Sequence, residues 1–269
     1  QTSGQWLAEE AIESLDVNLL PPAIASDGAG NVIITFSTND VVPVAYANVR
    51  TAASSAWSAA AATAISDLAP APATASSVVM NALGRAVVLF RSDATRVFVR
   101  QYQFGGDTPG WQGAAAYAAN YNPGLELIVE PVAVFGTAND FSIVSAHNNG
   151  RFLSLWPCTE GGCGDAQTFV NTSVDNSLRA GLHAARAAAG NLTVLFGIDQ
   201  PGYGVRPGAI RFHAGLNAWR GMNMLGQLGS IHVEGESALR LAVHPDGSAS
   251  ALFPSWNGSQ TLVRSADFR

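Results

Sequence analysis

Five copies of a short hairpin pattern follow one another along the chain, and this repeat constrains the fold more than any other feature. In each copy a strand of small apolar residues leads into a turn with Gly or Asn, and a second apolar strand follows. The copies are "AIASDGAGNVIITF" (23–36), "VVMNALGRAVVLF" (78–90), "VAVFGTANDFSIV" (132–144), "AARAAAGNLTVLF" (184–196) and "LAVHPDGSASALF" (241–253). A period of roughly 50 residues over five copies is typical of radial β-sheet arrays.

Two further segments follow each hairpin, so each repeat predicts a four-stranded sheet. The third segment alternates small or polar residues with large apolar ones, as half-buried strands do, at 42–49, 95–102, 150–156, 208–215 and 259–268. The fourth begins at Trp57, Trp111 and Trp219, with Phe169 in this place in the third copy. The residues after Trp57 are Ala-rich and would also suit a helix, but the repeat favours a strand.

The last copy has no fourth segment, because the chain ends at Arg269. Residues 5–12, "QWLAEEAI", carry Trp6 in the same pattern and precede the first hairpin. We therefore expect them to complete the last sheet, which would close a ring and remove exposed sheet edges. The predicted fold is all-β: one domain over 1–269, a five-bladed β-propeller of four-stranded blades. The blades are predicted at about 22–65, 76–119, 130–175, 182–226, and 238–269 together with 5–12.

The layout resembles bacterial propellers of the broad sialidase-like and Asp-box group, in which an Asp-x-x-Gly-Asn or Asp-x-Gly turn links two strands. Asp27, Gly30 and Asn31 fit that turn, as do Asp246 and Gly247, whereas copies two to four depart from it. The resemblance extends over the whole chain in its period. It implies that these turns are structural and lie away from any active site. Five-bladed relatives include glycoside hydrolases and multivalent lectins.

Charge and motifs exclude several functions. The net charge is −6, all 14 basic residues are Arg, and they are scattered. Nucleic-acid binding needs a positive face, so we expect no nucleic-acid partner. No apolar stretch approaches the roughly 20 residues of a membrane span. Without lysine there is no P-loop, and no dinucleotide fingerprint opens a helix, so no cofactor is expected.

Two cysteines, Cys158 and Cys163, lie in "CTEGGCG". Their spacing does not fit a Cys-x-x-Cys redox or zinc pair, and the intervening glycines would let the loop close. A local disulfide is the favoured interpretation, with two free thiols as the alternative. A disulfide indicates export, so we expect a secreted, periplasmic or cell-surface protein. Since the chain starts at Gln1, we interpret it as processed or trimmed.

The candidate catalytic residues come from segments that enter the innermost strand of each blade. A glycosidase needs carboxylates that face each other across one bond, and these segments supply Glu130, His183 and Glu236. The first two copies supply no acid, so surface charge or turn capping is the alternative for these residues. Glu234 and Arg240 are nearby candidates for binding. The histidines come singly from different copies, and no metal site is predicted.

Two tryptophans, Trp156 and Trp256, lie outside the repeated pattern. Trp156 directly precedes the cysteine loop, and Trp256 lies in the turn "PSWNGS". We select them as candidates for ligand contacts, with a place in the core as the alternative.

The polar loop residues differ between copies, which argues against five equivalent sugar sites. The leading hypothesis is a monomeric, exported, non-enzymatic propeller that binds or scaffolds a protein or a cell-envelope glycan. One alternative is a glycan-active hydrolase or lyase with an acid pair at the central mouth. Another is a propeller lectin with degenerate sites.

Overall fold

In the computed structural model most of the described residues form β-strands. The described residues are 12, 17–54, 57, 63–65, 73–91, 96–120, 130–136, 140–147, 151–160, 162–170, 177–200, 204–225, 239–244, 246–256, 259 and 261–268. Across these ranges the strands form five antiparallel sheets, numbered here 1 to 5 in chain order. The one helical element that they contain is a short 3-10 turn, Ala214–Leu216.

The first two sheets confirm the predicted order of strands. Sheet 1 has the order β1 (Ala23–Ser26), β2 (Val32–Ser37), β3 (Ala45–Arg50) and β4 (Thr63–Ala64). Sheet 2 has the order β5 (Thr74–Met80), β6 (Arg85–Arg91), β7 (Arg96–Gln103) and β8 (Gly110–Asn120). In the Ala-rich segment after Trp57, residues 63–64 form a strand and residues 58–62 lie outside the described part of the chain.

The other three sheets follow the same meander. Sheet 3 contains β9 (Val132–Phe135), β10 (Phe141–His147), β11 (Phe152–Thr159), β12 (Gly162–Cys163) and β13 (Gln167–Val170). Sheet 4 contains β14 (Ser177–Arg186), β15 (Leu192–Gln200), β16 (Gly204–His213), β17 (Ala218–Trp219) and β18 (Asn223–Met224). Sheet 5 contains β19 (Arg240–Val243), β20 (Ala249–Trp256) and β21 (Thr261–Phe268). Of the predicted closing strand, 5–12, residues 5–11 lie outside the described residues; Ile12 is described, lies outside the strands, and accepts a hydrogen bond at its carbonyl oxygen from Asn48 Nδ2 at 2.7 Å.

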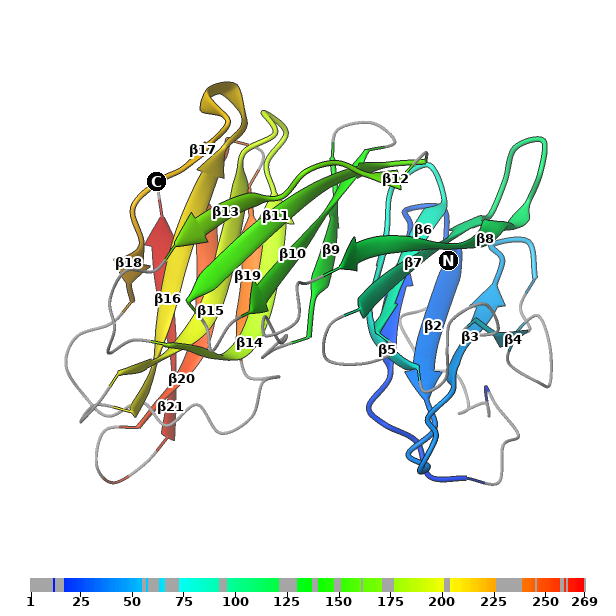
Figure 1. The fold of residues 1–269 in the computed structure, drawn as a ribbon, viewed down its shortest axis with the longest axis horizontal. Coiled ribbons are helices and arrows are strands. Elements are labelled where there is room, and N and C mark those ends of the chain that lie inside the picture. The colour runs from blue at the N-terminus through cyan, green and yellow to red at the C-terminus, as the bar shows by residue number, and fades with distance from the viewer. Residues whose placement is uncertain are drawn as a thin grey trace, which may run out of the picture.

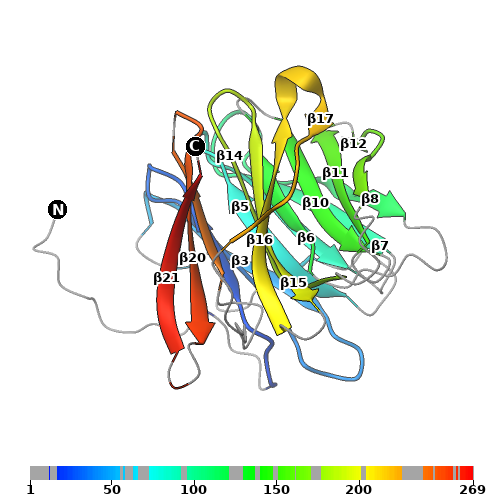
Figure 2. The same ribbon diagram turned by 90° about the vertical axis from the view of Figure 1, so that its left-hand side faces the viewer.

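Successive sheets contact one another through their first strands, in the order β1, β5, β9, β14, β19. Figure 1 shows this succession from the blue amino-terminal sheet at the right to the red carboxyl-terminal sheet at the left. Figure 2, turned by a quarter, shows sheet 5 beside sheet 4 at the other end of the series.

The core consists of apolar clusters between neighbouring sheets. On β10, Ile143 packs towards sheet 2 while the next residue, Val144, packs towards sheet 4. Successive side chains of a strand point to opposite faces, so a strand enclosed between two sheets must be apolar on both faces. This explains why second strands such as β2 and β6 are almost wholly apolar and buried.

The turns between first and second strands share one backbone geometry. In four copies a Gly amide donates to the carbonyl oxygen three residues earlier, at 3.4 Å in Gly30, 3.1 Å in Gly84 and 2.9 Å in Gly190 and Gly247. These glycines have φ of 98°, 72°, 84° and 88°, in the left-handed region that favours Gly. Copies two and four depart from the Asp-box sequence yet keep this turn, because the bond that all four share comes from the main chain. Asp27 Oδ1 and Asn81 Oδ1 each accept two further bonds from turn amides, which Ala187 cannot do.

Gly84→Ala should therefore destabilise the fold. Its φ is positive, and a Cβ there would lie 3.2 Å from Asp27 Oδ2 and 3.3 Å from Phe104 Cβ. We expect the free energy of unfolding to fall by about 1–2 kcal/mol, measured by urea denaturation. Gly28→Ala is the matched control, since no atom lies within 4 Å of its added Cβ. Equal effects of the two substitutions would contradict this account of the turn.

A chain of hydrogen-bonded side chains crosses sheet 3 from a buried histidine to an exposed threonine. His147, with 5% of its surface exposed, has Nε2 2.8 Å from Ser154 Oγ, which lies 2.9 Å from Thr168 Oγ1. The His147 ring also stacks on Phe152, with centroids 5.4 Å apart. Burial lowers the pKa of His147 from 6.5 to about 4, because the charged ring would lose its hydration.

This lowered pKa predicts acid sensitivity. Below about pH 6.5 the unfolded chain binds a proton at His147 that the folded protein does not accept until about pH 4. The free energy of unfolding should therefore be undiminished above pH 6.5 and fall as the pH drops through this window. Urea denaturation at several pH values should show a smaller decline for His147→Gln. His244→Gln, at an exposed ring, should leave the decline unchanged; if both variants behave like the wild type, another group is responsible.

Candidate functional site

Two of the predicted candidates at the mouth, Glu130 and Arg240, lie near the starts of first strands. Glu130 precedes β9, and its Oε1 lies 2.8 Å from Nη2 of Arg91, the last residue of β6. The carboxylate therefore already has an arginine partner where sheets 2 and 3 meet.

The structure brings His183 and Arg240 together. They lie on β14 and β19, the contacting first strands of sheets 4 and 5. Burial lowers the pKa of His183, and the positive charge of Arg240 lowers it further. The register of β14 shifts on both sides of Ala180, so this strand is irregular just before His183. Glu234 and Glu236 lie outside the described residues, so the acid pair Glu130–Glu236 stays a prediction.

Trp156 lies on β11 and packs, partly buried, against the cluster between sheets 2 and 3. Its Nε1 donates to Ser145 Oγ at 3.3 Å. Trp256 ends β20, and its side chain is outside the described part. A ligand contact for either tryptophan stays a prediction.

The predicted disulfide between Cys158 and Cys163 is present. The two residues are direct register partners on β11 and β12, and we call residues 158–163 the disulfide hairpin. Glu160 near its tip forms an ion pair with Arg85 on β6, with 2.8 Å between Oε1 and Nη1. The hairpin of sheet 3 therefore reaches sheet 2. A disulfide is compatible with secretion.

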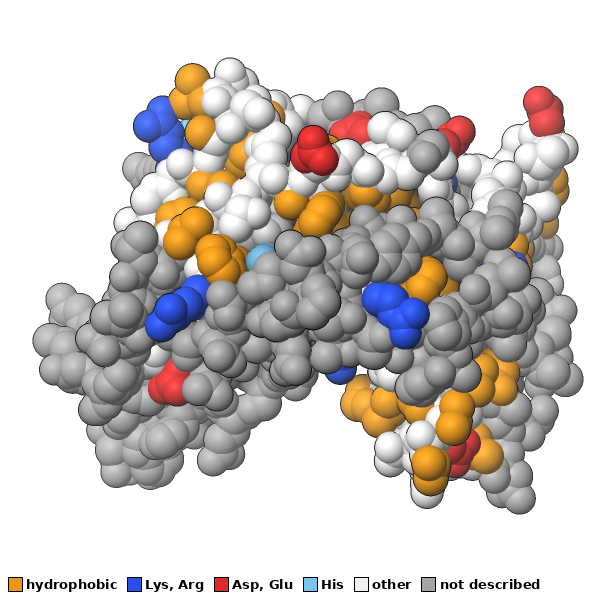
Figure 3. All heavy atoms as spheres, viewed as in Figure 1, with side chains coloured by type: hydrophobic (Ala, Val, Ile, Leu, Met, Phe, Trp, Pro, Cys, Tyr) orange, Lys and Arg blue, Asp and Glu red, His pale blue; other side chains and the backbone are white. Residues whose placement is uncertain are grey.

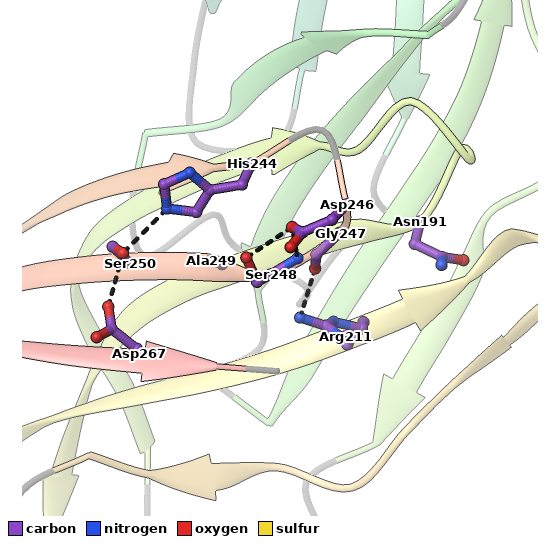
Figure 4. Close-up of a pocket in the computed structure, with 9 residues that line it drawn as sticks. All are labelled: Asn191, Arg211, His244, Asp246, Gly247, Ser248, Ala249, Ser250 and Asp267. Carbon is purple, nitrogen blue, oxygen red and sulfur yellow. Dashed lines mark hydrogen bonds between the residues drawn. The ribbon is translucent and has the colours of Figure 1, made fainter.

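A polar cleft lies at the opposite end from the mouth, where sheets 4 and 5 meet. We call it cleft 4/5; its volume is about 600 Å³, and Figure 4 shows its residues. Sheet 4 and its loops supply Asn191 and Arg211, and sheet 5 supplies the rest of the lining: His244, Asp246, Gly247, Ser248, Ala249, Ser250 and Asp267.

The side chains of cleft 4/5 are ordered by hydrogen bonds that run across sheet 5 and between the sheets. Ser250 Oγ lies between Asp267 Oδ1, at 2.6 Å, and His244 Nε2, at 3.2 Å. Arg211 Nη2 donates to Gly247 O at 3.0 Å, linking sheet 4 to the β19–β20 turn.

This arrangement does not suit a serine nucleophile. Ser250 donates its one hydroxyl proton to Asp267 Oδ1, so His244 Nε2 can only be the donor in its bond to Ser250. A catalytic serine instead gives its proton to a histidine base. Across the described ranges no cluster of metal-binding side chains occurs.

The carboxylate of Asp246 is an acceptor in this cleft. Ser248 donates to its Oδ1 from Oγ at 2.7 Å and from the backbone amide at 2.9 Å. These bonds lower the pKa of Asp246, since they stabilise its ionised form.

The repeats predict site residues at the mouth and a structural role for the Asp246 turn. The polar face was visible in "HPDGSAS", where His244, Asp246, Ser248 and Ser250 alternate with other residues. Arg211 carried no such signal, because only the packing of sheet 4 on sheet 5 brings it to this turn.

On the face seen in Figure 3, arginines stand singly rather than in a patch. The described part of the chain contains no helix that is long and apolar enough to cross a membrane.

No protein-family model matches the sequence, and no curated protein matches it. Solved structures share its fold. They include an unknown function protein from Dyadobacter fermentans, with a TM-score of 0.57 at 9% identity over 92% of this chain and 78% of that chain. A leech intramolecular trans-sialidase complexed with 2,7-anhydro-Neu5Ac has a TM-score of 0.54 at 11% identity over 87% of this chain and 40% of that chain. A PL25 ulvan lyase has a TM-score of 0.50 at 11% identity over 91% of this chain and 66% of that chain.

At these identities the likeness concerns the fold alone. With the five antiparallel sheets in contact through their first strands, it is consistent with a β-propeller.

Removing the disulfide should destabilise the protein without unfolding it. For the double variant Cys158→Ser, Cys163→Ser we expect the free energy of unfolding to fall by about 2 kcal/mol, since a short loop is no longer closed in the unfolded chain. Guanidinium denaturation measures this, and reduced wild type should show the same loss. Glu160→Gln, which removes only the ion pair to Arg85, should lose less than about 1 kcal/mol because its side chain is largely exposed. Undiminished stability in the double variant would contradict the prediction.

Proposed function

We propose that this chain is a glycan-binding β-propeller that binds its ligand in cleft 4/5 without catalysing a reaction on it. The observation that carries the proposal is the meeting of hydrogen-bond donors and acceptors from two sheets in one open cleft of about 600 Å³. This size falls in the range of small-molecule sites.

Sugars suit such a lining because each hydroxyl both donates and accepts a hydrogen bond. The carboxylates of Asp246 and Asp267 are acceptors with lone pairs left beyond their bonds to serine. Arg211 has five N–H donors, of which one is used by Gly247 O. The cleft therefore matches a polyhydroxyl ligand better than an apolar one.

The hydrogen bonds to Asp246 and Asp267 favour binding without catalysis. Glycoside hydrolysis needs one carboxylic acid kept protonated by a raised pKa, beside a second that is ionised. The pKa of Asp246 is instead lowered by its hydrogen bonds from Ser248, and Asp267 accepts a hydrogen bond from Ser250.

We further propose that the five sheets are the blades of a closed ring, with residues 5–12 completing the last blade. Two observations support closure. The described part of sheet 5 has three strands, one fewer than a full blade. Leu252 and Val263 on sheet 5 and Ile24 on sheet 1 are exposed apolar residues on the two terminal sheets, which a closing strand and ring contact would cover.

An exported, monomeric bacterial protein fits this proposal. The disulfide supports an oxidising compartment, and a propeller would leave only short sheet edges for pairing with a second copy. A protein ligand in place of the glycan, and catalysis at the mouth by Glu130, His183 and Glu236, are the alternatives that the experiment below addresses.

A printed glycan array followed by calorimetry with the best glycan tests the proposal. We expect the wild type to bind a subset of glycans, and Arg211→Met and Asp267→Asn each to weaken binding by about tenfold or more, since each loses a charge-assisted hydrogen bond. Arg264→Met, at an exposed arginine of β21, is the matched control and should bind as the wild type does.

Absence of binding to any glycan would overturn the proposal. Glycan cleavage during long incubation, detected by chromatography, would overturn its non-catalytic part. Loss of that cleavage in Glu130→Gln or Glu236→Gln would then move the site to the mouth.

A further inference from the structure

A second cleft lies between sheets 3 and 4, also at the turn end, and we call it cleft 3/4. Its volume is about 610 Å³. Its rim includes the disulfide hairpin, and its apolar walls include Leu155 and Phe212, which belong to the core cluster between these sheets. It shares no lining residue with cleft 4/5.

Arg186, the last residue of β14, is the cation of cleft 3/4. Its side chain is 15% exposed. Nη2 donates to Ser142 Oγ, and Nη1 lies 3.7 Å from Asp140 Oδ2, beyond good hydrogen-bond distance. Nε is buried and has no acceptor among the described residues. The guanidinium is thus taken out of water with few of its five donors used.

An unused acceptor lines the same cleft. Gln167 Oε1 is buried without a donor among the described residues, while its Nε2 donates to Asn217 Oδ1. Buried polar groups in native proteins almost always have partners. An unpaired donor and an unpaired acceptor in one cleft therefore indicate a ligand that offers an acceptor to the first and a donor to the second.

The charge of that ligand follows from the surroundings of Arg186. Burial lowers the pKa of its guanidinium, and the negative charge of Asp140 opposes this shift only in part. Among the described residues, Asp140 is the acidic group that faces the guanidinium, and it is itself half-exposed. A carboxylate bound directly to Arg186 would make the shorter, charge-assisted bonds that Asp140 does not make.

We propose that cleft 3/4 binds an acidic sugar, whose carboxylate contacts Arg186 and one of whose hydroxyls donates to Gln167 Oε1. The C–H face of the sugar ring would lie on the apolar walls. The site differs from cleft 4/5 in its residues and in the charge of its ligand, so it does not rest on the function proposed for that cleft.

Calorimetry with D-glucuronate and D-glucose tests this proposal, because the two sugars differ only in the carboxylate. We expect one glucuronate bound per chain and glucose at least about tenfold weaker. Arg186→Met should abolish the preference. Gln167→Glu should weaken glucuronate by a similar factor through charge repulsion, and it keeps the test valid if Arg186→Met fails to fold by circular dichroism. Arg211→Met, in cleft 4/5, is the control and should retain the preference.

Four results would overturn the proposal. The first three are equal binding of the two sugars, no binding of glucuronate, and a preference that survives both Arg186→Met and Gln167→Glu. Loss of the preference in Arg211→Met would also overturn it, because glucuronate would then bind in cleft 4/5. A glycan array that gives no evidence of binding in cleft 4/5 leaves these expectations unchanged.

Discussion

Apolar packing between neighbouring sheets is the interaction on which the rest of this structure depends. A strand such as β10 contributes to two clusters at once, since Ile143 and Val144 point to opposite sheets. Each apolar side chain removed from water in this way contributes on the order of 1.5–3 kcal/mol. An interior sheet enclosed on both faces has no face left for solvent or ligand. Between such sheets, polar side chains therefore gather at the two ends of the sheets, where strands begin and turn.

Both clefts occur at one of these ends, and their different linings follow from local sequence. Cleft 4/5 is bordered by a turn rich in Asp and Ser, with Arg211 reaching across from sheet 4. Cleft 3/4 has core residues in its walls and one buried arginine. The disulfide hairpin adds a covalently closed rim to the second cleft, and Glu160 ties that rim to sheet 2. Two neighbouring sheet interfaces thus present different polar and apolar side chains on the same arrangement of strands.

The strands could be predicted from the sequence because their signal is local. Runs such as "VIITF" and "AVVLF", bounded by turns, identify buried strands without knowledge of their neighbours. The disulfide could be predicted for the same reason, since Cys158 and Cys163 are close in the chain. The clefts could not be predicted, because Arg186 and Gln167 line one cleft, and Arg211 bonds to Gly247, only when two sheets pack. Of the predicted mouth, His183 and Arg240 do come together, while Glu234 and Glu236 lie outside the described residues.

The turn that links the first two strands holds its shape through main-chain bonds and a left-handed Gly. Its first residue is Asp27 in one copy, Asn81 in another, Ala187 in a third and His244 in a fourth. An acid, an amide, a methyl group and an imidazole thus occupy one backbone position without altering its geometry. Asp27 and Asn81 add side-chain bonds to the turn amides, but the copy with Ala187 keeps the turn without them. This corner of the repeat is consequently a place where surface chemistry can vary while the main-chain turn persists. A protein built on it can acquire a new specificity at one junction while the remaining junctions keep theirs.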